Sequence, residues 1–234
     1  MGAGTSGRIG LIDAVECKPT YGVSPEMVQC LMAGGVGAMV QAVEGAEDSK
    51  ELAVEDLKRI NLTNKDIVIG IAASGRTPYV IGGIEYAKKV GAKTASISTS
   101  KDTILSSMVD CPIEAVTGAE PITGSTRMKS GTAQKMICNM ISTASMVKMG
   151  KVYQNLMIDV QATNEKLVAR ATGIITELTG LEKEEAKLAF DKYGSVKKAM
   201  LGVLAGIDPD EVDIILNKHK GNIREALKEV GIND

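Results

Sequence analysis

The sequence Ala72-Ala73-Ser74-Gly75-Arg76-Thr77-Pro78 joins an apolar run over residues 67–71 to a helical pattern that begins at Pro78. That run predicts a buried strand, while Thr77 suits the cap of a helix and Pro78 its first position. A strand, a turn of small residues and a helix N-terminus form an anion site, because backbone N–H groups and the helix dipole attract negative charge there. The Ser74 hydroxyl adds a donor, and Gly75 lets a ligand approach the backbone closely.

Two further segments rich in glycine, hydroxyl-bearing and basic residues occur at predicted helix starts. Gly2-Ala-Gly-Thr-Ser-Gly-Arg8 repeats the Ser-Gly-Arg core, and Gly124-Ser-Thr-Arg-Met-Lys-Ser-Gly-Thr132 opens a long helical pattern that begins at Ala133. A plain surface loop is an equally good explanation for any one such turn. Three of them, rich in hydroxyls, glycines and cations, favour a phosphorylated ligand.

The remaining patterns predict an α/β fold. Strands are predicted over residues 27–32, 67–71, 94–99 and 113–116, and helices over residues 6–16, 36–48, 51–60, 78–90, 104–109, 133–150 and 164–178. Strands that alternate with helices in this way are typical of a mostly parallel sheet with helices on both faces. The hydroxyl-rich loops then lie at the carboxyl ends of strands, where ligands bind in such sheets.

The alternation of strand and helix patterns ends at Gly180. Four short helical patterns follow one another after it, over residues 183–191, 196–204, 208–218 and 222–230. They predict a compact helical domain of about fifty residues, close to the lower size limit for independent folding. We therefore divide the sequence into an α/β domain of residues 1–179 and a small helical domain of residues 180–234.

The composition argues against several classes of partner. Aromatic residues make up only 3% of the chain and the formal net charge is −2, so neither base stacking nor electrostatic attraction favours a nucleic acid or an anionic membrane. Four cysteines without a C-x-x-C pair and a single histidine argue against a zinc site and favour reduced thiols. Without a signal peptide or an apolar run of spanning length, we expect a soluble, cytoplasmic protein.

The hydroxyl-rich loops and the sequence between them closely resemble the N-acetylmuramic acid 6-phosphate etherase family, within the sugar isomerase (SIS) domain superfamily. The matching blocks are Gly2-Ala-Gly-Thr-Ser-Gly-Arg8, Asp13-Ala-Val-Glu-Cys17, Pro19-Thr-Tyr-Gly22, Ala42-Val-Glu-Gly-Ala-Glu-Asp-Ser49, Gly70-Ile-Ala-Ala-Ser-Gly-Arg-Thr-Pro-Tyr-Val80, Gly124-Ser-Thr-Arg-Met-Lys129, Gly131-Thr-Ala-Gln-Lys135 and Asn155-Leu-Met157. The resemblance implies an SIS-type, flavodoxin-like sandwich that forms a homodimer. The tail, notably Lys220-Gly-Asn-Ile-Arg-Glu-Ala226, looks like a small ubiquitin-associated-type helical module.

The sequence departs from the family pattern in two ways. The resemblance implies a preceding segment of several tens of residues, including a helix and the first strand, which this sequence does not contain. Val15 and Lys18 stand where the family usually has Ser and often has Pro, and both lie beside Glu16.

The resemblance implies removal of the lactyl ether from carbon 3 of N-acetylmuramic acid 6-phosphate, without a metal or other cofactor. It assigns Glu16 as the proton donor and Glu47 as the second acid/base residue. Two carboxyl groups can do this work if their environments push their pKa values apart. For the phosphate and the sugar we expect Thr5, Ser6, Gly7, Ser74, Gly75, Ser125, Thr126 and Lys129, with Arg76 and Arg127 as further candidate cations.

Purely structural explanations compete with these functional roles. An arbitrary glutamate is usually a solvated surface charge, although apolar and small neighbours such as Ile12 and Val15 make a raised pKa plausible for Glu16. In a straight helix, Glu16 lies about 13 Å from Gly7. The phosphate therefore belongs at Ser74-Gly75 or Ser125-Thr126, or a second subunit completes the site. The alternative functions are a non-catalytic sugar-phosphate sensor and an aldose–ketose isomerase.

Overall fold

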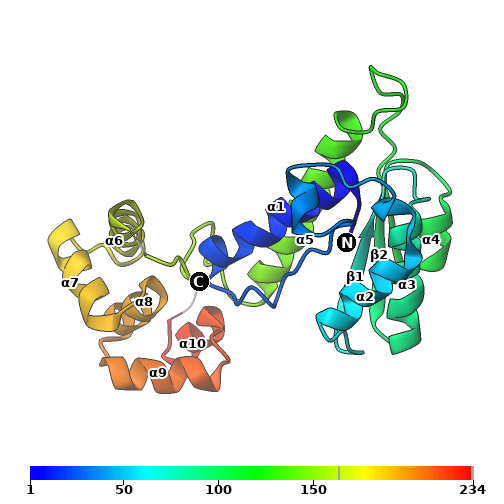
Figure 1. Cartoon of the computed structure of the whole chain (residues 1–234). Helices are drawn as coiled ribbons and strands as arrows, with labels where there is room; N and C mark the ends of the chain where they lie inside the picture. Colours follow the sequence, from blue (N-terminus) through cyan, green and yellow to red (C-terminus); the bar gives the residue numbers. More distant parts are fainter. Residues whose placement is uncertain (163, 233–234) are drawn as a thin grey trace. The chain divides into compact units, whose positions relative to one another are not determined.

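The computed structural model describes residues 1–162 and 164–232, and the chain forms two compact units (Figure 1). The first unit contains Met1–Val15 and Val28–Ile141, and the second contains Glu16–Met27 and Ser142–Asp234. Two long helices, α1 (Gly4–Tyr21) and α5 (Lys129–Lys148), contribute residues to both units. Within the part of the chain that the structure describes, no helix has the length and apolar character needed to cross a membrane.

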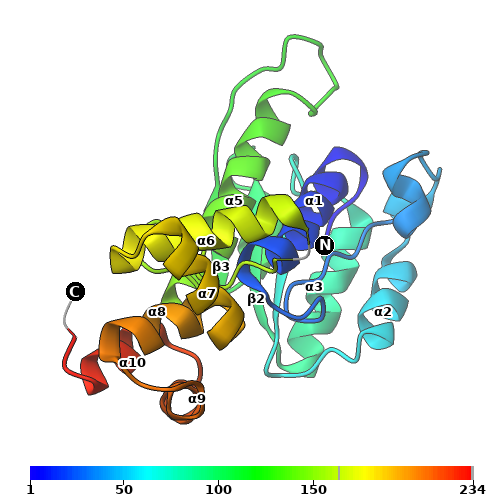
Figure 2. The same cartoon turned by 90° about the vertical axis from the view of Figure 1, so that its left-hand side faces the viewer.

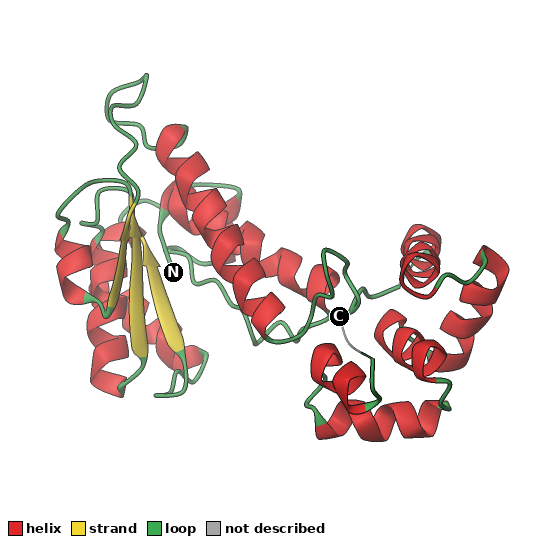
Figure 3. Cartoon of the chain, turned by 180° about the vertical axis from the view of Figure 1, so that it is seen from behind, coloured by secondary structure: helices red, strands yellow, loops and turns green. Residues whose placement is uncertain are grey.

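A three-stranded parallel sheet lies at the centre of the first unit (Figure 3). Its strands are β1 (Ile67–Ile71), β2 (Lys93–Ser98) and β3 (Cys111–Glu114), in the order β1-β2-β3. The prediction for β1 is confirmed residue by residue, β2 begins one residue earlier than predicted, and β3 begins two residues earlier. In register, Ile69 faces Ala95 and Ala95 faces Cys111.

The free side of β1 pairs with the first two residues of the chain. The Met1 carbonyl oxygen accepts a hydrogen bond from the Ile71 amide at 2.8 Å, and the Met1 ammonium group donates to the Ile69 carbonyl at 2.7 Å. Gly2 forms parallel bridges with both Ile71 and Met32. The strand predicted over residues 27–32 is wrong, because this short pairing partner leaves only Met32 in a bridge.

Helices α3 (Pro78–Val90) and α4 (Ile104–Met108) cover one face of the sheet, and α2 (Lys50–Arg59) packs outside α3. Their core includes Leu57, Val68, Tyr79, Val80, Ile84 and Leu105, which are almost fully buried. Pro78 occupies the first position of α3 and Gly91 ends the helix in the left-handed region, as predicted. Thr77 precedes the helix as predicted, but its side chain makes no capping hydrogen bond.

Helices α1 and α5 cover the other face, where Ile9 and Ile137 pack with Ile71 and Ile97 of the sheet. The two helices run side by side (Figure 2), and the Asn139 side chain donates a hydrogen bond to Asp13. The predicted parallel sheet with helices on both faces is therefore confirmed. Helix α1 is longer than predicted and continues through Pro19 to Tyr21.

The helix predicted over residues 36–48 is wrong. The structure has two short 3₁₀ turns there, η1 (Val36–Met39) and η2 (Ala46–Asp48), separated by irregular backbone. Gly45, which lies inside this range, has a φ of 74° in the left-handed region, and such a residue interrupts a helix. Val36 is 80% exposed and Val40 is 92% exposed, so their helical spacing does not reflect burial against a core.

The second unit is helical, with α6 (Glu165–Thr179), α7 (Lys183–Tyr193), α8 (Val196–Ala205), α9 (Pro209–Lys218) and α10 (Ile223–Glu229). Asn164, Ser195, Asp208 and Asn222 cap four of these helices with side-chain oxygen atoms. The predicted helical tail is confirmed. Because α6 shares one core with α7–α10, the compact unit begins before residue 180, and a domain boundary at 179/180 stays a prediction.

Candidate active site

The turn after β1 is held rigidly against its neighbours. Gly75 has a φ of 63°, and a Cβ atom at this position would clash with the Thr103 side chain. The Gly75 carbonyl accepts a hydrogen bond from the Leu105 amide at 3.1 Å. Gly75 is thus required by the packing of the turn on the residues that begin α4, whereas Ser74 is exposed beside it.

A cavity of about 280 Å³ opens beside this turn, and eight of its thirteen lining residues are serines or threonines. Ser74, from the turn after β1, lines this cavity together with Ser125 and Thr126 from the segment before α5. Other lining hydroxyls belong to Thr99, Ser100, Thr117, Thr123 and Ser130. Three of the predicted phosphate ligands therefore lie around one cavity at the carboxyl ends of β1 and β2. We call it the hydroxyl cavity.

A carboxylate of the chain itself occupies the N-terminus of α5 at the edge of the hydroxyl cavity. Glu120 accepts hydrogen bonds from the backbone amides of Lys129 at 3.1 Å and Ser130 at 3.0 Å. These backbone hydrogen bonds, that from Ser130 foremost, lower the pKa of Glu120. The Lys129 ammonium group donates to the Ala119 carbonyl at 2.8 Å. Lys129, predicted to bind the phosphate, thus closes the base of the loop that presents Ser125 and Thr126.

Replacing Glu120 by Gln should lower the melting temperature of the protein most strongly at neutral pH. Because the pKa of Glu120 is lower in the folded chain, its stabilising effect is present above the ordinary value of 4.5 and is lost as pH falls through the folded value. The difference in melting temperature from the parent should therefore shrink at acidic pH. Melting curves between pH 3 and pH 7 test this. A difference independent of pH would contradict it.

The first glycine-rich segment, residues 2–8, which we call the first loop, is packed within the protein, and from Gly4 onward it forms the first turn of α1 rather than a loop. The Ser6 hydroxyl is buried and donates to the Gln134 side chain at 2.9 Å. A Cβ atom on Gly7 would lie 2.7 Å from the Gly2 carbonyl oxygen, so this glycine permits a close backbone approach. Thr5 is half-buried and faces Gly131 of α5. Sequence reasoning did not assign Gln134, although it lies in one of the matching blocks.

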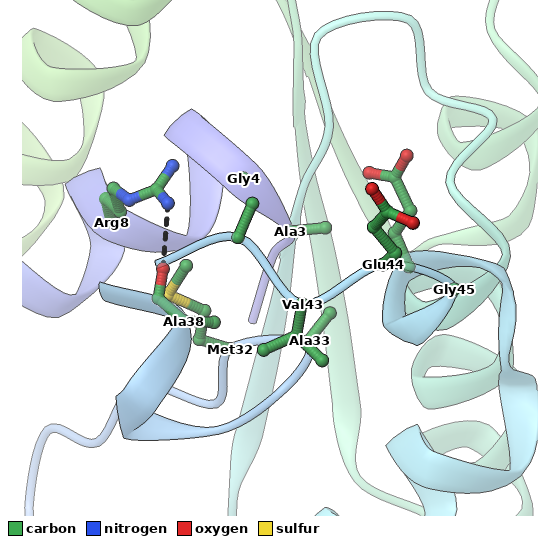
Figure 4. Close-up of a pocket in the computed structure, with 11 residues that line it drawn as sticks. Ala3, Gly4, Arg8, Met32, Ala33, Ala38, Val43, Glu44 and Gly45 are labelled. Atoms are coloured by element: carbon green, nitrogen blue, oxygen red, sulfur yellow. Dashed lines mark hydrogen bonds between the residues drawn. The ribbon is translucent and has the colours of Figure 1, made fainter. Parts of the chain in front are cut away.

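Glu47 lines a second cavity of about 210 Å³, which we call the glutamate cavity (Figure 4). Its other lining residues include Gly4 and Arg8 of α1 and Glu44. Arg8 donates from Nε to the Met39 carbonyl at 3.0 Å and from Nη2 to the Ala38 carbonyl at 2.8 Å. The structure therefore places Glu47 next to the first loop. Arg8 and Glu44 were not predicted, because Arg8 bonds to carbonyls 30 and 31 residues away and Glu44 lies in a segment that was expected to be helical.

Glu16 lies on α1 among the residues of the second unit and is exposed. The apolar surroundings expected for it are not formed within the described chain, because Ile12 is 53% exposed and Val15 is 60% exposed. The candidate cations Arg76 and Arg127 are exposed as well.

The parallel sheet between two helical layers, with hydroxyl-rich loops at its carboxyl end, defines an SIS-type α/β domain. Residues 1–88 match the family model of the glucokinase regulatory protein N-terminal SIS domain, and residues 154–193 match the model of the C-terminal lid domain of that protein.

Curated relatives match nearly the whole chain. A protein of Exiguobacterium sp. strain AT1b is 58% identical over 97% of this chain and 78% of its own length. Proteins of Clostridium beijerinckii and Clostridioides difficile are each 54% identical over 98% of this chain and 76% of their own length. All three are named N-acetylmuramic acid 6-phosphate etherase. The chain belongs to the N-acetylmuramic acid 6-phosphate etherase family.

Proposed function

We propose that the protein cleaves the D-lactyl ether of N-acetylmuramic acid 6-phosphate to give N-acetylglucosamine 6-phosphate and D-lactate. The observation that carries this proposal is 54–58% identity to relatives of that name over 97–98% of the chain. The pathway it serves is the recycling of cell-wall amino sugars in the cytoplasm.

The reaction is an elimination followed by an addition. In the open-chain sugar the aldehyde at carbon 1 acidifies the proton on carbon 2, which Glu47 removes as the base. The C3–O bond then breaks, and the lactate oxygen leaves with a proton from Glu16, so that an unsaturated aldehyde forms. Water adds at carbon 3 and supplies the new hydroxyl oxygen. General acid–base catalysis of this kind contributes about 10²–10⁴-fold in rate.

The binding roles follow from the two cavities. The hydroxyls of Ser74, Ser125 and Thr126 around the hydroxyl cavity suit a phosphate, and the turn at Gly75 and the ammonium group of Lys129 keep their loops in place. Gly4 and Arg8 line the glutamate cavity, and we assign the sugar to Thr5, Ser6 and Gly7, which lie between them in sequence. This arrangement supports a sugar-phosphate substrate. The elimination and the addition need no metal or redox cofactor.

Isotopes test the proposed sequence of bonds. Turnover in H₂¹⁸O should place ¹⁸O on carbon 3 of N-acetylglucosamine 6-phosphate and none in the ether oxygen of lactate. Turnover in D₂O should place deuterium on carbon 2. Lactate that carries the label would mean cleavage on its own side of the ether and would overturn the elimination. An isomerised sugar without lactate would favour the isomerase alternative.

A second candidate function is a sugar-phosphate sensor. The matches to the SIS and lid domains of a regulatory protein favour it. It differs from the etherase in one measurable way, because a sensor binds the sugar phosphate without releasing lactate. The presence of both Glu16 and Glu47 favours the etherase.

We also propose that the protein acts as a homodimer. Met136 and Met140 lie one turn apart on α5 and are 49% and 57% exposed, and Val36 and Val40 are more exposed still. Exposed apolar side chains one turn apart on a helix, such as Met136 and Met140, suit a contact surface. Light scattering should give twice the chain mass of 24.6 kDa for the parent and one chain mass for Met140→Lys. A monomeric parent would contradict the proposal.

A further inference from the structure

Glu47 lies on a segment that has few internal supports. Residues 34–48 form two 3₁₀ turns rather than a helix, and Gly34, Gly35 and Gly45 have positive φ angles. Val36 and Val40 are the most exposed large apolar residues of the described chain. Such a segment depends on contacts from elsewhere for a fixed position. A carboxylate that must meet one substrate proton needs such a contact, because a displacement of about 1 Å can cost 100-fold in rate.

Two contacts hold the segment. Ala46 of η2 is buried in the core that includes α3, and Arg8, from the first turns of α1, holds the η1 end. Its Nε and Nη2 groups donate to the successive carbonyls of Met39 and Ala38, at 3.0 and 2.8 Å. These carbonyls end the 3₁₀ turn η1, where a cation is favoured. The planar guanidinium group makes both bonds at once in a fixed geometry, which a lysine ammonium group cannot reproduce. Ala38 is 3% exposed, so the segment is anchored at a buried point.

Arg8 also joins two parts of the site. It follows Thr5, Ser6 and Gly7 directly in sequence, and it lines the glutamate cavity together with Glu47. In Figure 4 its side chain reaches the backbone at Ala38, while the segment continues past Val43 to Glu44 and Gly45. The start of α1 and the segment that carries Glu47 are therefore joined by the Arg8 side chain.

We infer that Arg8 is a positioning residue for Glu47, holding the segment of residues 34–48 so that the carboxylate faces a substrate bound at the first loop. The inference rests on the proposed function for the catalytic role of Glu47. The hydrogen bonds that carry it do not depend on that function, so the two can fail separately.

Hydrogen exchange of the full-length protein tests the anchor without reference to activity. Arg8→Met should raise amide exchange in residues 36–48 at least about tenfold and leave α2 unchanged. The matched control is Arg59→Met, which removes an exposed arginine paired with Asp56 on α2 and should leave residues 36–48 unchanged. Equal exchange in parent and Arg8→Met would overturn the inference.

Kinetics test the link to Glu47. Arg8→Met should lower kcat for D-lactate release about 10- to 100-fold with a smaller change in KM, and Arg8→Lys should not restore it. Added methylguanidinium should recover part of the kcat of Arg8→Ala. In a Glu47→Gln background, Arg8→Met should lower kcat little further, because both changes impair the same catalytic step. Losses that multiply would overturn the inference, whereas a parent without lactate release would overturn the proposed function and leave hydrogen exchange to decide the anchor.

Discussion

Replacing Glu47 by Gln should lower the rate of D-lactate release about 10²–10⁴-fold, the range that a general acid–base group contributes. The change keeps the size of the side chain and removes its ability to accept a proton. Glu47 is exposed on η2 and lines the glutamate cavity, so the fold should tolerate the amide. The measurement is kcat for lactate release from N-acetylmuramic acid 6-phosphate, with the melting temperature as a check on folding.

Glu44→Gln is the matched control, because Glu44 lines the same cavity three residues away and is also exposed. It removes the same charge from the same cavity and should retain kcat within a few-fold. A similar loss in both variants would mean that the charge of the cavity matters rather than a specific base. A fully active Glu47→Gln variant would remove Glu47 from the mechanism.

Asp159→Asn should lower the free energy of unfolding of the second unit by about 3–5 kcal/mol, the cost of leaving one partner of a buried ion pair alone. Lys197 is buried, and its ammonium group contacts Asp159 at 2.5 Å and donates to the Gly221 carbonyl at 3.0 Å. Lys151 lies 3.4 Å from the same carboxylate. Without Asp159, the ammonium groups of Lys197 and Lys151 both lose the carboxylate that they contact.

The loss of unfolding free energy caused by Asp159→Asn should be smaller at high pH than at neutral pH. Burial lowers the pKa of Lys197 despite the opposing effect of Asp159. The folded state therefore binds this proton less tightly than the unfolded state, and the penalty for burying the cation is relieved as pH rises through the folded pKa. Urea unfolding at neutral pH and near pH 10 measures this. The control Asp191→Asn breaks an exposed pair with Lys187 and should cost no more than about 0.5 kcal/mol. Equal effects of the two substitutions would contradict the account.

The elements predicted correctly are those whose signals are local. The strand β1, the turn at Gly75 and the start of α3 at Pro78 follow from a short apolar run, small residues and a proline in succession. Helices α7–α10 follow from short periodic patterns separated by caps such as Ser195 and Asp208. In each case, neighbours in sequence decide the structure.

The errors occurred where distant contacts decide the structure. Residues 36–48 carry apolar residues at helical spacing, but Gly45 has a positive φ, and the carbonyls of Ala38 and Met39 bond to Arg8 rather than within a helix. The strand predicted over residues 27–32 depends on pairing with Met1–Gly2, which is too short to extend it. Glu120 was missed because its partners at Lys129 and Ser130 meet it only when the loop closes.

Release of D-lactate from N-acetylmuramic acid 6-phosphate distinguishes the etherase from the sensor. We expect release by the parent, together with an equal amount of N-acetylglucosamine 6-phosphate, and a strong reduction in both Glu16→Gln and Glu47→Gln. A folded parent that binds the sugar phosphate and releases no lactate would contradict the etherase and leave the sensor as the function.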